Sequence, residues 1–227
     1  MIRVHVICEG QTEEMFIKEL LFSHFDSKGI WLIPALVGKP GHKGGNFRIE
    51  RLLIDVRNRL LGDQAAYCTT FFDFYGLPTE FPGKVEAAGR ATPKAKAMVL
   101  CKALTEALTP PIGSKAMRRF IPYVQMFEFE ALLFSDPEVL ARGIGHENLG
   151  AEFRMVRSAF DSPESINDSP RTAPSKRIVK KVKDYEKPIY GTMAAMEIGL
   201  PTMRKECALF DKWLKRIEGL AEGAKGE

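Results

Sequence analysis

The chain has few of the features that would mark a secreted, zinc-binding or membrane protein. Its 227 residues include four cysteines, at positions 8, 68, 101 and 207, and no two of them form a Cys-x-x-Cys pair. This spacing favours neither a disulfide framework nor a short zinc motif. No apolar run approaches the length of a membrane span, and the start resembles no targeting signal because Arg3 and His5 interrupt its apolar residues. We therefore expect a soluble, cytoplasmic protein with reduced thiols and no membrane partner.

The chain also lacks a strong excess of charge of either sign. Its net charge is +4, which is too small to indicate nucleic-acid binding by itself. The segment 171–187 nevertheless carries a net charge of +5, so the rest of the chain has a net charge of −1. The basic excess is thus one local patch, in a chain that is 45% apolar, enough for a sizeable core.

The first candidate site is the stretch MIRVHVICEGQTEE, in which a short apolar run leads into Glu9, Gly10 and the start of a helix. Gly10 permits a sharp turn and leaves Glu9 at the carboxyl end of a buried strand, where open α/β sheets place their ligand sites. Glu13 follows one helical turn later. Two simpler interpretations stay open: Glu9 as a solvated turn residue, and Glu13 as an acid that favours the helix N-terminus.

A second carboxylate follows a second β-prone run, AAYCTTFFD at 65–73. If this run is a strand parallel to the first, Asp73 lies beside Glu9 at the same sheet edge. Such an acidic pair can hold Mg²⁺, which prefers hard oxygen ligands and usually keeps several waters. The alternative is that Asp73 only forms a turn.

Two further acids, Glu128 and Glu130, begin the apolar segment MFEFEALLFSD. Acids in a first helical turn stabilise the helix through its dipole, which is the usual explanation. Because their surroundings are strongly apolar, we expect at least one of them to face the same cleft as Glu9 and Asp73.

The remaining pattern predicts helices alternating with strands. Apolar spacing indicates helices near 17–25, 49–60 and 92–108, strands at 30–37 and 120–125, and two closing helices over 191–214. Pro34 places the strand at 30–37 at an edge or a bulge, and prolines at 110 and 111 should stop the preceding helix. The glycine-rich segment 38–48 can offer N–H groups to a phosphate, but it lacks a P-loop ending and reads equally as a surface loop.

The basic segment reads as a helix that starts at Pro174. On it Lys176, Lys180, Lys183 and Lys187 would share one face, with apolar residues on another. A row of cations near an acidic metal centre suits a phosphate backbone, although solvated lysines on an ordinary helix remain the alternative. The candidate nucleic-acid-binding residues are Arg171, Lys176, Arg177, Lys180 and Lys183.

Several motifs together resemble those of a bacterial family of Toprim-like proteins akin to the nuclease domain of OLD-family proteins. The motifs are EGQTEE, FFDFYGLP, FIPYVQ, EFEALLFSD, INDSPRTAPSKRI and a C-terminal IGL…C…FDKWL. The resemblance covers Ile2 to about Leu214 and implies an α/β fold, with about four mainly parallel strands flanked by helices and a helical C-terminal extension. It also implies an association with AAA or ABC-type ATPases in phage-defence loci.

The resemblance assigns the Toprim glutamate to Glu9, with Glu13 in the same motif, and the Asp-x-Asp element to residues 73–75. Tyr75 stands where the family has its second aspartate, so two-metal chemistry would need an oxygen from Glu128 or Glu130. Relatives carry a histidine before Glu-Phe-Glu, where this chain has Phe127. We expect a Toprim-like core at 1–136, a helical extension packed on it at 137–220, and a flexible tail at 221–227.

The leading hypothesis is a divalent-metal-dependent phosphodiesterase, a Toprim-type nuclease acting on DNA or RNA as an anti-phage effector. Glu9 and Asp73 would bind Mg²⁺ or Mn²⁺, with Glu128 or Glu130 completing the ligand set. Lys176 or Arg177 would neutralise charge on the phosphate, and Glu13 would be a ligand or proton acceptor.

Two alternatives belong to other classes. One is a non-catalytic partner subunit of an ATPase with a degenerate Toprim fold, and the other is nucleic-acid binding without cleavage through the lysine face. A homo-oligomer is compatible with each of these hypotheses.

Overall fold

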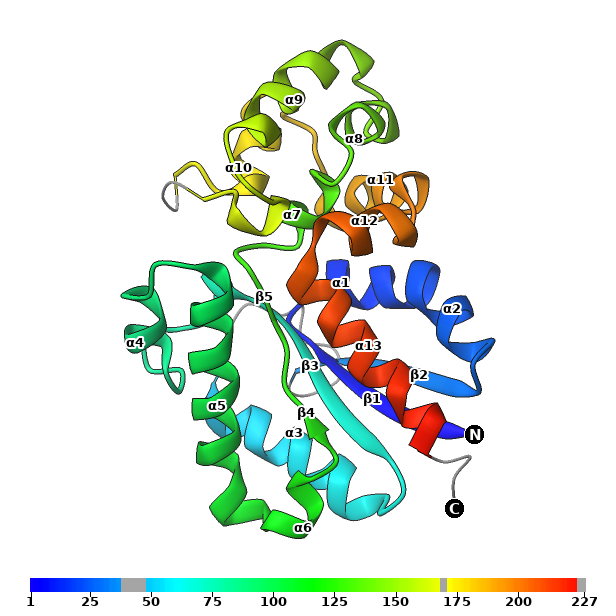
Figure 1. The fold of residues 1–227 in the computed structure, drawn as a ribbon, viewed down its shortest axis with the longest axis vertical. Coiled ribbons are helices and arrows are strands. Elements are labelled where there is room, and N and C mark those ends of the chain that lie inside the picture. Colours follow the sequence, from blue (N-terminus) through cyan, green and yellow to red (C-terminus); the bar gives the residue numbers. More distant parts are fainter. Residues whose placement is uncertain (38–47, 168–170, 224–227) are drawn as a thin grey trace.

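The computed structural model describes residues 1–37, 48–167 and 171–223 and shows an α/β fold around one parallel sheet (Figure 1). The strand order is β2-β1-β3-β4, and β5 pairs with β3 beyond β4. Every pairing is parallel. The strands are β1 (Ile2–Cys8), β2 (Ile30–Leu36), β3 (Tyr67–Asp73), β4 (Phe120–Ile121) and β5 (Val124–Gln125). The expected fold class, with its mainly parallel strands, is confirmed.

Helices connect and cover these strands. The α-helices are α1 (Gln11–Phe16), α2 (Phe22–Asp26), α3 (Ile49–Gly62), α4 (Lys84–Ala88), α5 (Pro93–Ile112), α6 (Ser114–Met117), α7 (Glu130–Leu133), α8 (Pro137–Gly143), α9 (Gly150–Ser158), α10 (Pro174–Val179), α11 (Thr192–Ile198), α12 (Leu200–Glu206) and α13 (Ala208–Gly223). Shorter turns are the π-helical segments η1 (Ile17–Leu21) and η5 (Lys187–Gly191) and the 3-10 segments η2 (Phe74–Gly76), η3 (Glu147–Leu149) and η4 (Pro163–Ser165).

The two faces of the sheet bury different helices, because successive side chains of a strand point in opposite directions. On β1, Val4 and Val6 join the core cluster that contains α1, η1, α2 and α13. Ile7 joins the cluster formed with α3 and α5. Figure 1 shows α13 crossing one side of the sheet and α8 to α12 gathered at one end of the molecule. The described sheet is therefore covered on both faces, as a parallel sheet requires.

Hydrogen bonds join the helix α13 to the sheet and to the segment before α10. Trp213 lies against the sheet, and its indole Nε1 donates a hydrogen bond of 2.9 Å to Oγ1 of Thr69 on β3. Glu164 is 3% exposed and accepts hydrogen bonds of 2.9 Å from the backbone N–H groups of Leu209 and Phe210. A residue of a turn-rich connector thus satisfies two N–H groups that the start of the helix leaves without helical partners.

The structure corrects three expectations about helices. The helix predicted to carry the basic residues ends at Val179, so Lys180, Lys183 and Lys187 lie beyond it. Three helices, α11 to α13, close the chain over the stretch where two were predicted. A short helix, α4, precedes α5 where no helix was predicted.

The helix α5 begins as predicted but passes through the prolines that should stop it. Thr92 caps it, with Oγ1 accepting a hydrogen bond of 3.2 Å from Ala95 N. At its other end Pro110 and Pro111 lie inside the helix. Their missing N–H groups would have bonded carbonyls of residues 106 and 107, and both of these residues are exposed, so water can satisfy those carbonyls.

Other expectations concern the ends and the exterior of the molecule. The strand β2 lies at one end of the strand order, as Pro34 predicts. Within the described ranges, no helix combines the length and apolar character that crossing a membrane would require. Most of the glycine-rich segment (38–47) and the last four residues lie outside the described residues. The proposed division at residues 136 and 220 stays a prediction.

Candidate active site

The site begins where β1 and β3 end side by side. These neighbouring parallel strands pair up to Cys8 and Phe71, so Glu9 and Asp73 emerge at the same edge of the sheet. The Glu9 backbone N–H donates to the Phe71 carbonyl (3.2 Å), and the Glu9 carboxylate Oε2 accepts from the Asp73 backbone N–H (3.0 Å). The strand register therefore holds the Glu9 side chain against the backbone of Asp73, and the predicted proximity is present.

Gly76 leaves the space that the Glu9 carboxylate occupies. A Cβ atom placed on Gly76 would lie 1.9 Å from Glu9 Oε1 and 2.4 Å from its Oε2. Real Cβ atoms do not approach other atoms so closely, so no side chain fits here while Glu9 keeps its position. The turn after β3 thus forms a cradle for a carboxylate.

Glu13 is the third acid at this edge and is 5% exposed. Its Oε2 accepts a hydrogen bond of 2.8 Å from the Gly10 backbone N–H at the start of α1. Burial, and then the neighbouring charge of Glu9, raises the pKa of Glu13 to about 7. Glu13 is therefore more than a solvated acid at a helix start: it can exchange a proton near neutral pH.

Asp73 is a buried acid whose surroundings disfavour its charged form. Its Oδ1 is buried and has no hydrogen-bond partner among the described residues. Burial, and then the charges of Glu13 and Glu9, raises the pKa of Asp73 well above its ordinary value, while Lys187 opposes this rise. An oxygen in this position lacks a positively charged or hydrogen-bonding partner.

Glu128 and Glu130 reach the same region from the chain before and at the start of α7. Glu130 is fully buried, and the Lys187 ammonium lies 2.9 Å from its Oε1 and 3.0 Å from its Oε2. The Glu128 Oε2 accepts a hydrogen bond of 2.8 Å from Ser175 N, at the start of α10. Burial raises the pKa of Glu130, and Lys187 opposes the rise. The charge of Glu128 acts on Glu9 and that of Glu130 acts on Asp73, whereas a cleft shared by these acids stays a prediction.

We refer to Glu9, Glu13, Asp73, Glu128 and Glu130 as the acidic cluster. Lys187 is its closest cation: burial lowers the pKa of Lys187, but the charges of Glu130, Asp73 and Glu128 outweigh burial and raise it. Lys187 therefore carries its positive charge throughout the physiological pH range.

A second cation, Lys84 of α4, also lies near the acidic cluster. Its ammonium donates to the Phe74 carbonyl and lies 3.5 Å from the centre of the Phe74 ring. Burial lowers the pKa of Lys84 to about 8, and the charge of Glu9 opposes this fall. Lys84 thus lies close enough to Glu9 to interact with its charge.

The predicted nucleic-acid-binding residues lie farther out. Lys176, Lys180, Lys183 and Arg171 are exposed, and Arg177 donates a hydrogen bond of 2.8 Å from Nε to the Thr172 carbonyl. Lys176 follows Ser175 directly, so α10 begins at the cluster, but no ion pair joins Lys176 to an acid within the described residues. Their roles in binding or catalysis stay predictions.

Tyr75, which the motif resemblance assigns to the place of a second aspartate, donates hydrogen bonds to residues outside the acidic cluster. Its hydroxyl donates to Oδ1 of Asn167, and its backbone N–H donates a hydrogen bond of 3.0 Å to the carbonyl of Phe127. The centre of the Phe127 ring lies 5.5 Å from that of the Tyr75 ring. The two positions at which this chain departs from the pattern that the resemblance implies are therefore in contact with each other.

The cluster fits a divalent cation only in part. No three His, Cys, Asp or Glu side chains of the described residues are arranged so that they could hold a metal ion together. Glu9 and Asp73 do meet at one edge, and Asp73 Oδ1 has no partner. Since Mg²⁺ is commonly held by one or two carboxylates, waters and substrate phosphates, the residues present suit such an ion.

Neither Lys187 nor Lys84 is predicted as a site residue from the sequence. Lys187 is predicted to share a helix face with Lys176, and the spacing of the basic segment does not distinguish it from neighbouring lysines that are exposed. The turn over residues 180–186 and the buried ring of Tyr185, which is 8% exposed, return the chain to the acids. For Lys84 the sequence holds no signal that we can identify.

Three comparisons relate the chain to known proteins. A family model described as "Domain of unknown function (DUF4276)" matches residues 8–218. No curated protein matches the chain. The solved structure of the C-terminal region of the Burkholderia pseudomallei OLD protein is similar, with a TM-score of 0.47 and 14% identity, over 96% of this chain and 98% of that chain. The range matched by the family model contains the whole acidic cluster.

Proposed function

We propose a function for this chain from the premise that it belongs to the DUF4276 family: it is a divalent-metal-dependent phosphodiesterase that cleaves DNA or RNA. The observation that carries the proposal is the unpartnered, buried Oδ1 of Asp73 beside the carboxylate of Glu9. Burial raises the pKa of both acids, which is consistent with carboxylates whose charge a cation at the strand ends would stabilise.

Electrostatics favours a cation-dependent centre over an ordinary buried salt bridge. The five carboxyl groups of the acidic cluster face two ammonium groups, those of Lys187 and Lys84, among the described residues. Buried charges are normally paired or bound to metals, because leaving them unpaired is costly. A divalent cation would neutralise most of the remaining negative charge, and protonation of Glu13, whose pKa is about 7, would neutralise the rest.

Glu9 and Asp73 would hold the ion, which is Mg²⁺ or Mn²⁺, and Glu128, whose charge acts on that of Glu9, would be a further ligand. When bound, the ion would supply Lewis-acid stabilisation of charge on a phosphate oxygen. Glu130 is already bound by Lys187, so it positions that lysine instead of completing the ligand set.

The chain's own residues would carry the remaining steps. Glu13, with a pKa of about 7, would accept the proton of the attacking water. Lys187 would stabilise negative charge that develops on the phosphate, because its ammonium is held by Glu130 on one side and faces Asp73 on the other. This assigns to Lys187 the role that sequence analysis gave to Lys176 or Arg177.

The wider setting rests on the motif resemblance. We propose that the chain works with an AAA or ABC-type ATPase as an effector of phage defence in the cytoplasm. The exposed cations Arg171, Lys176, Lys180 and Lys183 would contact the phosphate backbone on either side of the cleavage point.

A second candidate function is a non-catalytic subunit with a degenerate site. The observation that favours it is Tyr75, whose hydroxyl bonds Asn167, at the position of the family's second aspartate. This candidate predicts normal folding and partner binding with no cleavage and no cation binding at Glu9.

The test is cleavage of supercoiled plasmid and of total tRNA with Mg²⁺ or Mn²⁺, with and without any AAA or ABC-type ATPase encoded beside the chain. The wild type is compared with Glu9→Gln and with Asp63→Asn, a matched control in which a surface carboxylate that pairs with Arg3 is changed. We expect cleavage by the wild type and the control and at least about a tenfold loss in Glu9→Gln, since even changes to residues that only support metal ligands commonly cost about 10- to 100-fold. Intact substrates in every lane with folded protein would refute the phosphodiesterase proposal and favour the non-catalytic subunit.

A further inference from the structure

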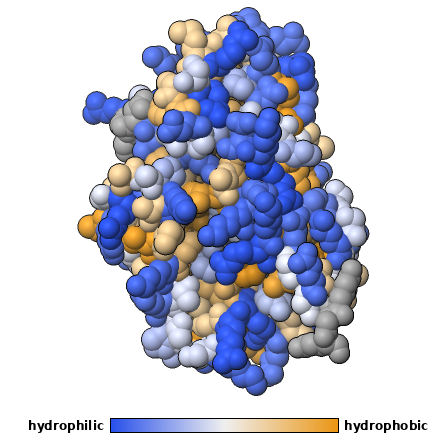
Figure 2. All heavy atoms as spheres, viewed as in Figure 1, coloured by the Kyte–Doolittle hydropathy of each residue, from blue (hydrophilic) through white to orange (hydrophobic). Residues whose placement is uncertain are grey.

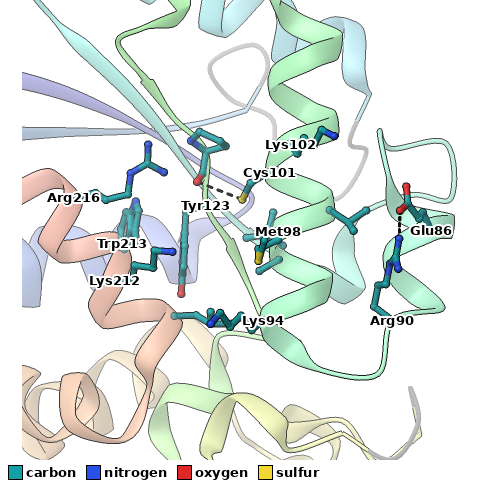
Figure 3. Close-up of a pocket in the computed structure, with 15 residues that line it drawn as sticks. Glu86, Arg90, Lys94, Met98, Cys101, Lys102, Tyr123, Lys212, Trp213 and Arg216 are labelled. Carbon is teal, nitrogen blue, oxygen red and sulfur yellow. Dashed lines mark hydrogen bonds and ion pairs between the residues drawn. The ribbon is translucent and has the colours of Figure 1, made fainter.

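A cavity that is separate from the acidic cluster lies between α5 and α13. Its volume is about 510 Å³, within the range of sites that bind small molecules. Figure 3 shows the two helices on opposite sides, with the link between β4 and β5 behind them. Met98 of α5, Leu209 of α13 and Pro122 of the link supply apolar surface. Figure 2 shows apolar surface between the hydrophilic surfaces on the two sides.

Three cations stand at the rim of this apolar surface. Lys94 comes from α5, and Lys212 and Arg216 come from α13. Among the residues at 1–37, 48–167 and 171–223, none forms a recorded ion pair with these three. The other cations at the cavity differ, since Arg90 binds Glu86 and the ammonium of Lys102 lies 3.8 Å from a Glu106 carboxylate oxygen.

The arrangement of the rim cations is electrostatically unfavourable without an anion. Lys212 and Arg216 are four residues apart on α13, so their like charges face the same side of the helix and repel each other. They also reach across the cavity to α5: burial raises the pKa of the Cys101 thiol to about 11, and the charges of Arg216 and then Lys212 oppose that rise. The cations of one helix thus act on the wall formed by the other.

We propose that this cavity binds a nucleotide, with the base on the apolar surface and the phosphates between Lys94, Lys212 and Arg216. A fatty acid would satisfy the apolar surface but bring a single negative charge to three cations. Inorganic phosphate would satisfy the cations but leave the apolar surface exposed. A nucleoside diphosphate matches both, and the Met98 side chain, which is 62% exposed at the cavity, can pack against a planar ring.

This inference does not depend on the proposed phosphodiesterase activity. The cavity is lined by Val124, whose neighbour Gln125 pairs with Asp73 through β5, so the two sites share a strand but no side chain of the acidic cluster. Binding can therefore be measured in EDTA, where no divalent cation can bridge phosphate to the acids.

The experiment is isothermal titration calorimetry of the full chain with ADP, GDP, CDP and UDP in EDTA. Adenosine, inorganic phosphate and decanoate are titrated separately, because each carries only one feature of the proposed ligand or of its alternatives. We expect at least one nucleotide to bind with Kd below about 1 mM and at least tenfold more tightly than adenosine, phosphate or decanoate. Lys212→Gln and Arg216→Gln should each weaken binding about tenfold. The matched control Lys215→Gln, on the same helix but outside the cavity, should leave it unchanged.

Each other outcome overturns the proposal. Absence of binding by all four nucleotides would show that the cavity is not a nucleotide site. Tighter binding of decanoate would assign it to an acyl ligand. Nucleotide binding that is unchanged in Lys212→Gln and Arg216→Gln, or that is lost in Asp73→Asn, would place the bound nucleotide elsewhere. Thermal unfolding of each variant is measured alongside, and we expect these surface substitutions to leave the fold intact.

Discussion

Replacing Lys187 by methionine removes the cation that lies closest to the buried acids while keeping most of the side-chain volume. In the structure its ammonium lies 2.9 and 3.0 Å from the two oxygens of Glu130, a residue with no exposed surface. The substitution therefore leaves a buried carboxylate without its partner. The folded protein must then either hold an unpaired charge or protonate Glu130.

The expected cost follows from the burial of each partner. Removing one member of a fully buried pair costs about 3–5 kcal/mol, but the Lys187 side chain is 39% exposed and water screens part of the interaction. We therefore expect Lys187→Met to lower the free energy of unfolding by about 2 kcal/mol near pH 7.5. The cost should shrink at acid pH, because neutral Glu130 needs no cation and burial already raises its pKa.

The assay is urea unfolding followed by circular dichroism. Lys102→Met is the matched control, since its ammonium lies 3.8 Å from Glu106 and both side chains are largely exposed; we expect a change within about 0.5 kcal/mol. Combining Lys187→Met with Glu130→Gln should recover part of the lost stability, because Glu130 then leaves no unpaired charge while Asp73 and Glu128 still lack the lysine. If Lys187→Met changes stability no more than the control does, the buried ion pair is not formed as described.

Three more predictions follow from the same geometry. Because the pKa of Glu13 is about 7 in the folded protein and 4.5 ordinarily, its ionisation destabilises the fold, so stability should fall by about 3 kcal/mol from pH 4.5 to 7. Glu13→Gln should remove this part of the pH dependence in urea titrations, and an unchanged slope would contradict it. Gly76→Ala should displace Glu9 and weaken Mn²⁺ binding at least tenfold in calorimetry, whereas Gly62→Ala, with open space around it, should not; equal effects would contradict the cradle. Glu164→Ala should lower the free energy of unfolding by about 2 kcal/mol, because two N–H groups at the start of α13 lose their acceptor, and an unchanged urea midpoint would argue against this cap.

Local sequence patterns were enough to predict the strands that carry the site. The apolar runs before Glu9 and Asp73 form adjacent parallel strands, and the helix predicted near 92–108 begins at Pro93, with Thr92 as its cap. These predictions succeed because strand ends and helix caps are set by residues that are close in sequence. The family match likewise confirms membership in a family of unknown function, while the association with ATPases and phage defence stays a prediction.

Long-range packing decided what the sequence could not. Lys187 and Lys176 look alike in the sequence, yet only Lys187 touches a buried acid, because the chain turns back after α10. The hydrogen bonds from Ser175 to Glu128 and from the start of α13 to Glu164 join residues more than forty positions apart. No periodicity within one segment carries information about such contacts.

Calorimetric titration with Mn²⁺ measures whether the acids at the strand ends take up a divalent cation. The wild type should bind Mn²⁺, Asp73→Asn should bind at least tenfold more weakly, and Asp63→Asn, at a surface carboxylate, should match the wild type. Absence of Mn²⁺ binding to the folded wild type, or equal affinity in Asp73→Asn, would contradict the metal-dependent account of this site.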